Sequence, residues 1–166
     1  MACKVLQLSG WLDGEHPIDT AGTDHVAGQA AKLTASGWEL ALLPKDVLGV
    51  FKNDMVDEVA GGPQAADAPA AGYSNGTVVM GENKLELSPG FLKTGATQTP
   101  FKYPGTHTWA IGNRIFLATD GTWDNAPGTT NDPPFGVVTK PPTSATDTLE
   151  CVIDPMNGAL YSAVTT

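Results

Sequence analysis

The sequence predicts an all-β protein, a small β-barrel or β-sandwich with long loops and little helix. Short apolar or alternating stretches of strand length recur along its 166 residues. Turn-forming residues separate these stretches, since the chain contains 19 Gly and 13 Pro. Only 16% of the residues are charged, against about 25% in a typical domain, which leaves few residues for the solvent-facing sides of helices.

A degenerate internal duplication is the third observation behind this fold class. Both halves begin with a Leu-x-Leu-Ser segment, at residues 6–9 and 85–88. The further matches pair Gly28 with Gly112, Leu33 with Leu117, Gly37 with Gly121, and Gly49-Val50 with Gly136-Val137. The repeated positions are turn and packing residues, and none is an acid, a base or a nucleophile. The duplication therefore indicates architecture and not chemistry.

We therefore expect one β-rich domain over residues 1–166, with a repeat unit at 3–60, a linker at 61–76 and a second repeat unit at 77–166. The proposed linker is rich in Gly, Pro and Ala and has no hydrophobic periodicity. A chain of this length supports one ordinary core, and two fully separate domains are disfavoured.

In the first unit, residues 4–9 alternate as a strand and residues 11–23 form a polar loop. Residues 26–34 are strand-like up to the turn at Ser36-Gly37, and the apolar run 38–43 ends at Pro44. Short strands are expected at 47–51 and 55–59. A helix over 30–43 is the competing interpretation, which Thr34 and Gly37 disfavour.

In the second unit, strands are expected at 77–80, 84–87, 114–118, 135–139 and 149–153. Asn157-Gly158 lies between apolar stretches within 149–164 and predicts a hairpin. Two long loops, 89–107 and 123–134, are rich in Thr, Gly, Asn and Pro. Surface loops of this kind are candidates for contacts with a partner.

The charge of the chain disfavours two classes of partner. Its formal net charge is −9 and Arg114 is its one arginine, whereas nucleic acids and anionic membranes attract clustered Lys and Arg. We expect neither as a partner. The first residues lack the apolar stretch of a signal peptide, so synthesis in the cytosol is expected. Cys3 and Cys151 are then expected to be free thiols, with a disulfide as the alternative if the terminal strands meet.

Motifs for catalysis and metal binding are weak. Residues 72–76 match Gly-x-Ser-x-Gly, but a linker precedes the serine and a strand follows it, so an Asn-Gly turn is favoured over a hydrolase elbow. One acidic loop holds Asp13, Glu15, His16, Asp19, Asp24 and His25, and a second group holds Asp120, Asp124, Asn131 and Asp132. Neither spacing matches a known metal motif. We expect no enzyme, no metal and no cofactor.

The four tryptophans allow two interpretations. Trp38 and Trp123 follow the repeated glycines closely, which favours a place in the core. A carbohydrate-binding β module that uses Trp11 or Trp109 on a loop is the alternative function.

The second unit also carries a family resemblance. Three segments make up the motif: Ile111-Gly112-Asn113-Arg114-Ile115-Phe116-Leu117-Ala118-Thr119-Asp120-Gly121, then Phe135-Gly136-Val137-Val138, then Thr148-Leu149-Glu150-Cys151-Val152-Ile153. This pattern resembles the small capsid decoration proteins of tailed bacteriophages, also called cement proteins, and a fainter form of it occurs in the first unit. The resemblance covers about half of the chain and consists of turn and strand motifs.

The resemblance implies a structural virion protein on the outer surface of an icosahedral phage head. It would stabilise the capsid by bridging subunits of the major capsid protein, and it would self-associate, as a homotrimer more often than a dimer. The loops near 11–25 and 103–109 combine aromatic residues with polar backbone. The expected capsid or oligomer interface residues are therefore Trp11, His16, His25, Tyr103, His107 and Trp109.

Overall fold

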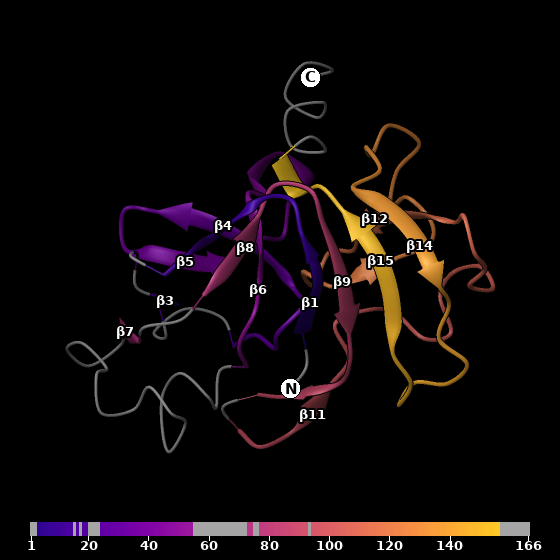
Figure 1. Ribbon diagram of the computed structural model, residues 1–166, viewed down its shortest axis with the longest axis horizontal. Coiled ribbons are helices and arrows are strands. Elements are labelled where there is room, and N and C mark those ends of the chain that lie inside the picture. The colour runs from indigo at the N-terminus through magenta and orange to yellow at the C-terminus, as the bar shows by residue number, and fades with distance from the viewer. Residues whose placement is uncertain are drawn as a thin grey trace.

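The computed structural model describes residues 3–14, 16, 18–19, 24–54, 73–74, 77–92 and 94–156. Over these residues the protein is built from two antiparallel-rich sheets and their connecting loops (Figure 1), which confirms the all-β fold class. The short 3₁₀ helix η1 spans Pro44–Asp46, and residues 155–156 are also helical.

The first sheet is fully antiparallel. Its strand order is β1 (Cys3–Leu8), β9 (Asn83–Leu87), β15 (Leu149–Ile153), β14 (Gly136–Lys140), β12 (Arg114–Leu117) and β13 (Trp123–Asp124). Side chains of β9 and β15 alternate between buried and half-buried, as expected for strands with one face on a core. A separate hairpin pairs β10 (Gly90–Phe91) with β11 (Thr97–Gln98).

The second sheet has the order β2 (Trp11–Asp13), β8 (Val78–Met80), β6 (Gly49–Phe51), β4 (Ala30–Thr34), β5 (Gly37–Leu40), β3 (Ile18–Asp19) and β7 (Tyr73–Ser74). Its pairs are antiparallel except β3 with β5. Each sheet therefore contains strands from both halves of the sequence, because β1 joins the second half and β8 joins the first.

The two halves repeat one arrangement of strands. In the first half β4 lies between β5 and β6, and in the second half β12 lies between β13 and β14. The backbone N–H of Gly28 donates to Phe51 O, and that of Gly112 donates to Val138 O. Both glycines have positive φ, 93° and 84°, which a side chain would strain. The matched glycines thus hold the same turn in each half.

The turn before each of these strands is also capped in the same way. The Gln29 side-chain oxygen accepts the N–H of Val26 at 2.8 Å, and the Asn113 side-chain oxygen accepts the N–H of Ala110 at 2.7 Å. An amide side chain that bonds to the backbone three residues earlier fixes a turn locally. Neither amide belongs to the glycine and leucine pattern seen in the sequence.

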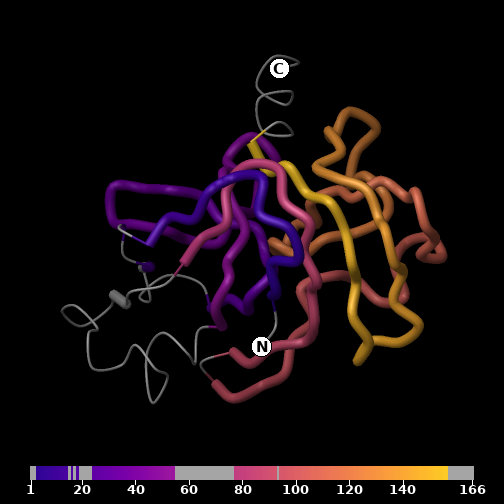
Figure 2. The backbone as a smooth tube through the Cα atoms, viewed as in Figure 1, coloured from indigo at the N-terminus to yellow at the C-terminus, as the bar shows by residue number. Residues whose placement is uncertain are grey.

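One continuous ribbon crosses between the sheets. The chain passes from β1 to β2 through Ser9 and Gly10, and it passes from β8 to β9 through Gly81 and Glu82. The ribbon β1–β2 therefore pairs with the ribbon β8–β9 around a corner. Figure 2 shows the two turns together near the top of the view. A Cβ on Gly10 would lie 1.9 Å from Met80 O, so the corner requires glycine there.

The Asn83 side chain holds this corner. Its oxygen accepts the N–H groups of Ser9 and Gly10 at 3.1 and 3.2 Å. Its nitrogen donates to the carbonyl oxygens of Met80 and Gly81 at 2.9 and 3.0 Å. The residue is 1% exposed, so these four bonds take the place of hydrogen bonds to water for backbone groups of both ribbons.

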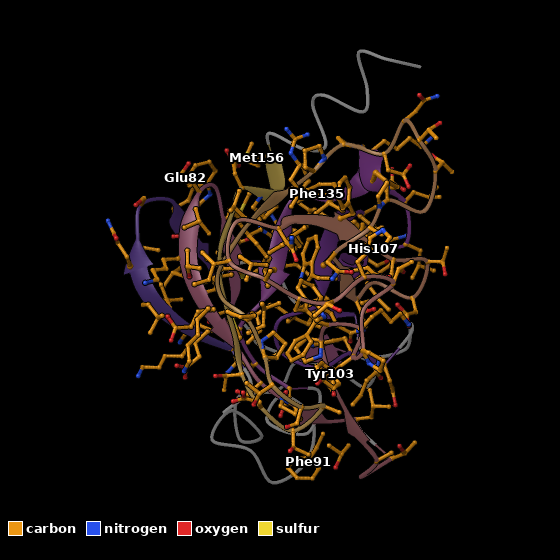
Figure 3. The ribbon with its side chains drawn as sticks, turned by 90° about the vertical axis from the view of Figure 1, so that its right-hand side faces the viewer. Glu82, Phe91, Tyr103, His107, Phe135 and Met156 are labelled. Carbon is orange, nitrogen blue, oxygen red and sulfur yellow. The ribbon has the colours of Figure 1, made fainter. Side chains whose placement is uncertain are left out.

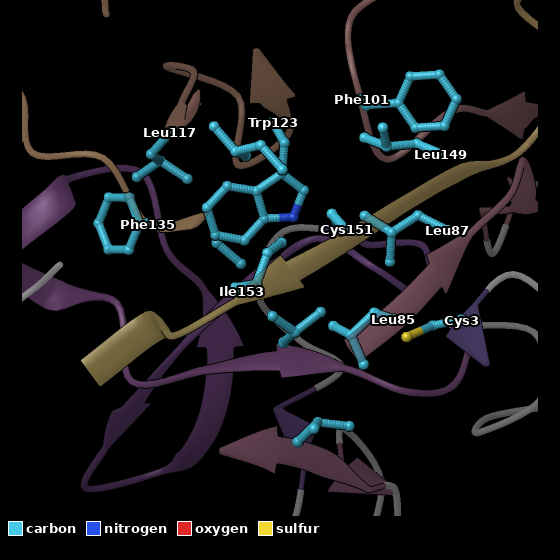
Figure 4. Close-up of a cluster of buried hydrophobic side chains, with 14 of the residues drawn as sticks. Cys3, Leu85, Leu87, Phe101, Leu117, Trp123, Phe135, Leu149, Cys151 and Ile153 are labelled. Carbon is cyan, nitrogen blue, oxygen red and sulfur yellow. The ribbon is translucent and has the colours of Figure 1, made fainter. Parts of the chain in front are cut away.

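The main core fills the space between the sheets. Figure 4 shows Leu85, Leu87, Leu149 and Ile153 from the first sheet in one buried cluster with Trp123, to which Val50 and Val79 of the second sheet also belong. The indole N–H of Trp123 donates to Gly28 O at 2.6 Å and ties the two halves together. A second cluster around Trp38 and Phe51 covers the other face of the second sheet. The core placement of Trp38 and Trp123 is confirmed.

Several element predictions need correction. The expected polar loop at 11–23 contains β2 and β3, and the expected linker contains β7. The loop at 89–107 contains the β10–β11 hairpin, and that at 123–134 begins with β13. These strands are two or three residues long and are defined by their partners, so local pattern could not reveal them. The strand at 26–34 begins later, at Ala30, because residues 26–29 form a turn.

The remaining strand predictions agree with the structure to within a few residues, and residues 149–153 match β15 in full. A helix over 30–43 is excluded, since β4 and β5 form a hairpin there. The predicted strand at 55–59 and the turn at Asn157-Gly158 lie outside the described residues.

Both cysteines are free and buried. Cys3 lies opposite Leu87 and Cys151 opposite Leu85, so β9 separates the strands that carry them. Strands two places apart in a sheet are about 9.5 Å apart, which is beyond the reach of a disulfide. Burial raises the pKa of Cys3 to about 12, and it also raises the pKa of Cys151. The expectation of free thiols agrees with this geometry.

Both thiols are expected to be inert in the folded protein, because the reactive thiolate is suppressed and the side chains are enclosed. Native protein at pH 8 should therefore show almost no reaction with Ellman's reagent, and unfolding in guanidinium should release 2 thiols per chain. Rapid labelling of the native state would contradict the described packing of β1 and β15.

Replacing Asn83 should destabilise the fold more than an ordinary polar change. Asn83→Ala leaves buried main-chain groups of both ribbons without partners, and we expect a loss of about 2–4 kcal/mol in the free energy of unfolding. Urea denaturation monitored by tryptophan fluorescence measures it. Asn131→Ala, at an exposed asparagine, is the matched control and should change stability by less than about 0.5 kcal/mol. Equal effects at the two sites would refute the role of Asn83.

Candidate functional site

The loop between Phe101 and Trp109 forms an exposed, hydrogen-bonded surface over the first sheet. Tyr103 and His107 are exposed, and Figure 3 shows both on the face of the molecule turned toward the viewer. Trp109 anchors the loop from below: it is buried, its indole donates to Lys102 O at 2.8 Å, and its ring meets Phe101 edge-on. The exposed residues thus stand on a fixed base.

Two residues at the end of β13, Asp124 and Asn125, hold the tip of this loop. Asp124 accepts the backbone N–H and the hydroxyl of Thr106. Asn125 accepts the N–H of His107 at 3.0 Å and donates back to His107 O. A Cβ on Gly105 would lie 2.5 Å from the Asn125 side-chain oxygen, so only glycine allows this approach. The loop is therefore fixed before any partner binds.

A second loop supports Tyr103 from the other side. The Tyr103 hydroxyl donates to Thr143 O at 2.8 Å. Asp147 in turn accepts the N–H and the hydroxyl of Thr143 and the N–H of Thr148. These bonds, the Thr143 N–H first, lower the pKa of Asp147 to about 2. Tyr103 thus rests on a turn that a carboxylate closes.

The two loops enclose a shallow hollow of about 310 Å³. Its lining is mostly neutral, with one histidine among aromatic, threonine and proline residues: Tyr103, Pro104, Gly105, Thr106, His107, Thr108, Trp109 and Pro142. Aromatic groups beside exposed polar groups are typical of protein interfaces. The hollow offers a binding surface and holds no pair of groups arranged for acid–base chemistry.

The six predicted interface residues divide into three groups. Tyr103 and His107 lie together on the loop described above. Trp11, half exposed on β2, and His16, exposed nearby along the chain, belong to the edge of the second sheet. His16 Nδ1 lies 2.7 Å from Asp13 Oδ2, which also accepts the indole N–H of Trp38. The structure does not join these two regions into one site.

His25 and Trp109 require correction as surface contacts. His25 is 1% exposed and its ring stacks on Phe51, with centroids 3.7 Å apart. Trp109 is 6% exposed. A partner on the surface does not reach either ring. Both rings are buried because they pack against apolar neighbours, and the composition of the surrounding loops did not indicate this packing.

Three of the acidic residues considered as cation ligands hold other parts of the fold. Asp120 accepts bonds from Lys102 and Thr122; burial alone would raise its pKa, but these bonds outweigh burial and lower it. Asp124 holds Thr106, and Asp13 holds Trp38. Among the described residues, no group of three or more His, Cys, Asp and Glu side chains is placed to hold a metal ion. Glu15 lies outside them.

The sequence reasoning missed two features. Asp124 and Asn125 fix the loop tip, and their only sequence signal is that they follow a predicted turn. The second feature is the exposure of Leu6, Leu8 and Leu12 along β1 and β2, at 37%, 51% and 45%. The alternation over residues 4–9 predicted β1 correctly, whereas Leu12 belonged to the expected polar loop. Only the sheet order shows that β1 and β2 both lie at an edge.

Comparisons with known proteins gave no match: no protein-family model, no curated protein and no solved structure resembles the chain significantly. The described part of the chain contains no helix long and apolar enough to cross a membrane. Ser74 of the Gly-x-Ser-x-Gly pattern lies in strand β7, and Gly72, Asn75 and Gly76 lie outside the described residues.

The carboxyl group of Asp147 should titrate near pH 2 in the folded protein, below its ordinary value of 3.8. Because folding lowers the pKa of Asp147, its carboxylate stabilises the turn fully above pH 3.8, and this stabilisation is lost as the pH falls through about 2. Carbon-13 NMR of the side-chain carboxyl measures the midpoint. Thr143→Ala removes one donor and should raise it; an unchanged midpoint would contradict the assignment.

Proposed function

We propose that this chain is a capsid decoration protein of a tailed bacteriophage. It docks on the outer surface of an icosahedral head, contacts the major capsid protein and links neighbouring subunits. It is a structural protein and not an enzyme, and its place is the virion surface after synthesis in the host cytoplasm. It also self-associates, as a trimer or a dimer.

The observation that carries this proposal is the agreement between the resemblance and the duplicated framework. The residues of the resemblance occupy β12, the turn at Gly121, β14 and β15. The first half has the equivalent turns, strands and main-chain bonds. The fainter first-unit pattern thus corresponds to a second copy of the same scaffold. A scaffold duplicated in this way supports a structural protein that binds partners through its surface loops and strands.

The fixed loop at 103–109 supports the proposal further. A loop held by Asp124, Asn125 and Thr143 loses little freedom when it docks. A ligand that binds assembled shells and not free subunits stabilises the shell by linkage. Many copies on one lattice then multiply a modest individual affinity. The net charge of −9 favours solubility before docking.

Carbohydrate binding is the second candidate, and the exposure of Trp11 favours it. Half of this residue is exposed, and its ring lies beside Gly81, which has no side chain. Trp109 is excluded as the stacking platform because it is buried. Glycan-induced quenching of tryptophan fluorescence that disappears in Trp11→Ala would favour this function over capsid docking.

Cosedimentation tests capsid docking. Expanded heads of the encoding phage, lacking this protein, should bind the purified chain in saturable amounts and become more resistant to heat. A Tyr103→Ala, His107→Ala double variant should weaken binding by about tenfold or more, as expected for truncated contacts at an interface centre. Phe91→Ala removes an aromatic that is 54% exposed outside this loop and should bind normally. Failure of the unaltered chain to bind heads would refute the proposal.

A further inference from the structure

We propose that the open edge of the ribbon β1–β2 is the surface through which two copies of this chain associate, as an antiparallel pair about a two-fold axis. The inference rests on the self-association within the proposed function and names its surface, but it does not require capsid binding. Three observations carry it: the edge is continuous, it is apolar, and it is nearly free of charge.

The edge is continuous across both sheets. β1 is the terminal strand of the first sheet and β2 is the terminal strand of the second. Among the described strands, each pairs on one side only, β1 with β9 and β2 with β8. The other described sheet ends, β13 and β7, are two residues long. An edge strand left open can add a strand from another chain.

Apolar side chains follow this edge. Leu6, Leu8, Trp11 and Leu12 are 37–51% exposed. The register of β1 on β9 shifts between Val5 and Gln7, so Leu6 lies in a β-bulge, and the three side chains from Leu6 to Leu8 are all exposed. A bulge re-aims side chains and increases the local twist. Apolar groups gathered in this way indicate an association surface.

The charge of the edge fits a second copy. The strands of this edge contain two charged residues, Lys4 and Asp13, whose charges cancel, although the net charge of the chain is −9. Two copies of an acidic chain repel one another over most of their surfaces. They meet with least repulsion at a segment without net charge, where burial of leucine and tryptophan then stabilises the pair. A strongly basic partner would gain nothing from this edge.

A two-fold axis at Gln7 gives the pair a consistent register. In an antiparallel pair about such an axis, residue i faces residue j and j faces i. Leu6 of each copy then faces Leu8 of the other. Lys4 faces Gly10, next to Trp11, whose ring attracts a cation. No like charges oppose one another in this register, and Gln7 faces its own counterpart.

Two measurements test this pairing. Light scattering should give the mass of a dimer for the unaltered chain. Leu8→Glu with Trp11→Glu places carboxylates on the edge and should raise the dissociation constant by about 100-fold or more. Leu43→Glu with Ile111→Glu is the matched control, at residues 52% and 74% exposed outside this edge, and should remain a dimer. Far-UV circular dichroism confirms that each variant folds.

Gln7→Cys tests the register directly, because the two-fold axis brings its thiol to its own counterpart. Facing residues in antiparallel strands have Cα atoms about 4.5–5.5 Å apart, within disulfide range. With oxidised glutathione as the oxidant, Gln7→Cys should form a covalent dimer, whereas Ser36→Cys, at an exposed turn, should not. The buried native thiols give no background.

A monomeric unaltered chain, a trimer, or an edge variant that keeps its dimer would overturn the inference, as would equal cross-linking of the two cysteine variants. Loss of glycan binding by the edge variant of a monomeric chain would assign the edge to a sugar instead. Head binding is scored separately: a dimer that ignores heads refutes capsid docking alone, and a monomer that binds them refutes only the pairing.

Discussion

The fold depends on the side-chain amide of Asn83 at the corner where two ribbons change sheets. An asparagine offers a donor and an acceptor group within one short, rigid unit, so it can bond to both ribbons at once. Here its oxygen accepts hydrogen bonds from backbone N–H groups of the ribbon β1–β2. Its nitrogen donates to backbone carbonyl groups of the ribbon β8–β9, to which Asn83 belongs. Without this corner, the first sheet would lose its edge strand β1, and the second sheet would lose β8, which lies between β2 and β6. The hydrogen bonds of one side chain thereby join the two sheets, and the core fills the space between them.

The halves share a main-chain framework but use their tryptophans differently. Trp123 turns its N–H inward to Gly28 O and ties the second half to the first. Trp38, which also pairs with the leucine of its hairpin, turns its N–H to Asp13 near the surface. The duplicated positions therefore preserve turns and strands, while the side chains at equivalent places have separate tasks. This difference explains why sequence similarity between the halves is confined to glycines and a few apolar residues.

The sequence was sufficient for the elements whose signals are local. Strand β15 alternates over its whole length, and Gly28, Gly37, Gly112 and Gly121 mark turns that need positive φ. It was insufficient where a partner far along the chain decides the outcome. β2, β3 and β7 exist because a neighbouring strand pairs with them, and His25 is buried because Phe51 reaches its ring. Tyr103 and His107 could be expected on a surface loop. The hydrogen bonds by which Asn125 holds that loop could not be predicted, because they join residues far apart in the chain.

The crossed ribbons also set an order of events during synthesis. Strands β1 and β2 leave the ribosome long before their partners are made; Ser9 and Asn83, which join at the corner, are 74 residues apart. Neither sheet can close until β8 and β9 have emerged, and closing so long a loop is slow compared with forming the local hairpins. During that interval the leucines of β1 stay exposed on an unpaired strand. A nascent chain of this kind is most prone to aggregation in its first half, before β8 and β9 pair with β2 and β1.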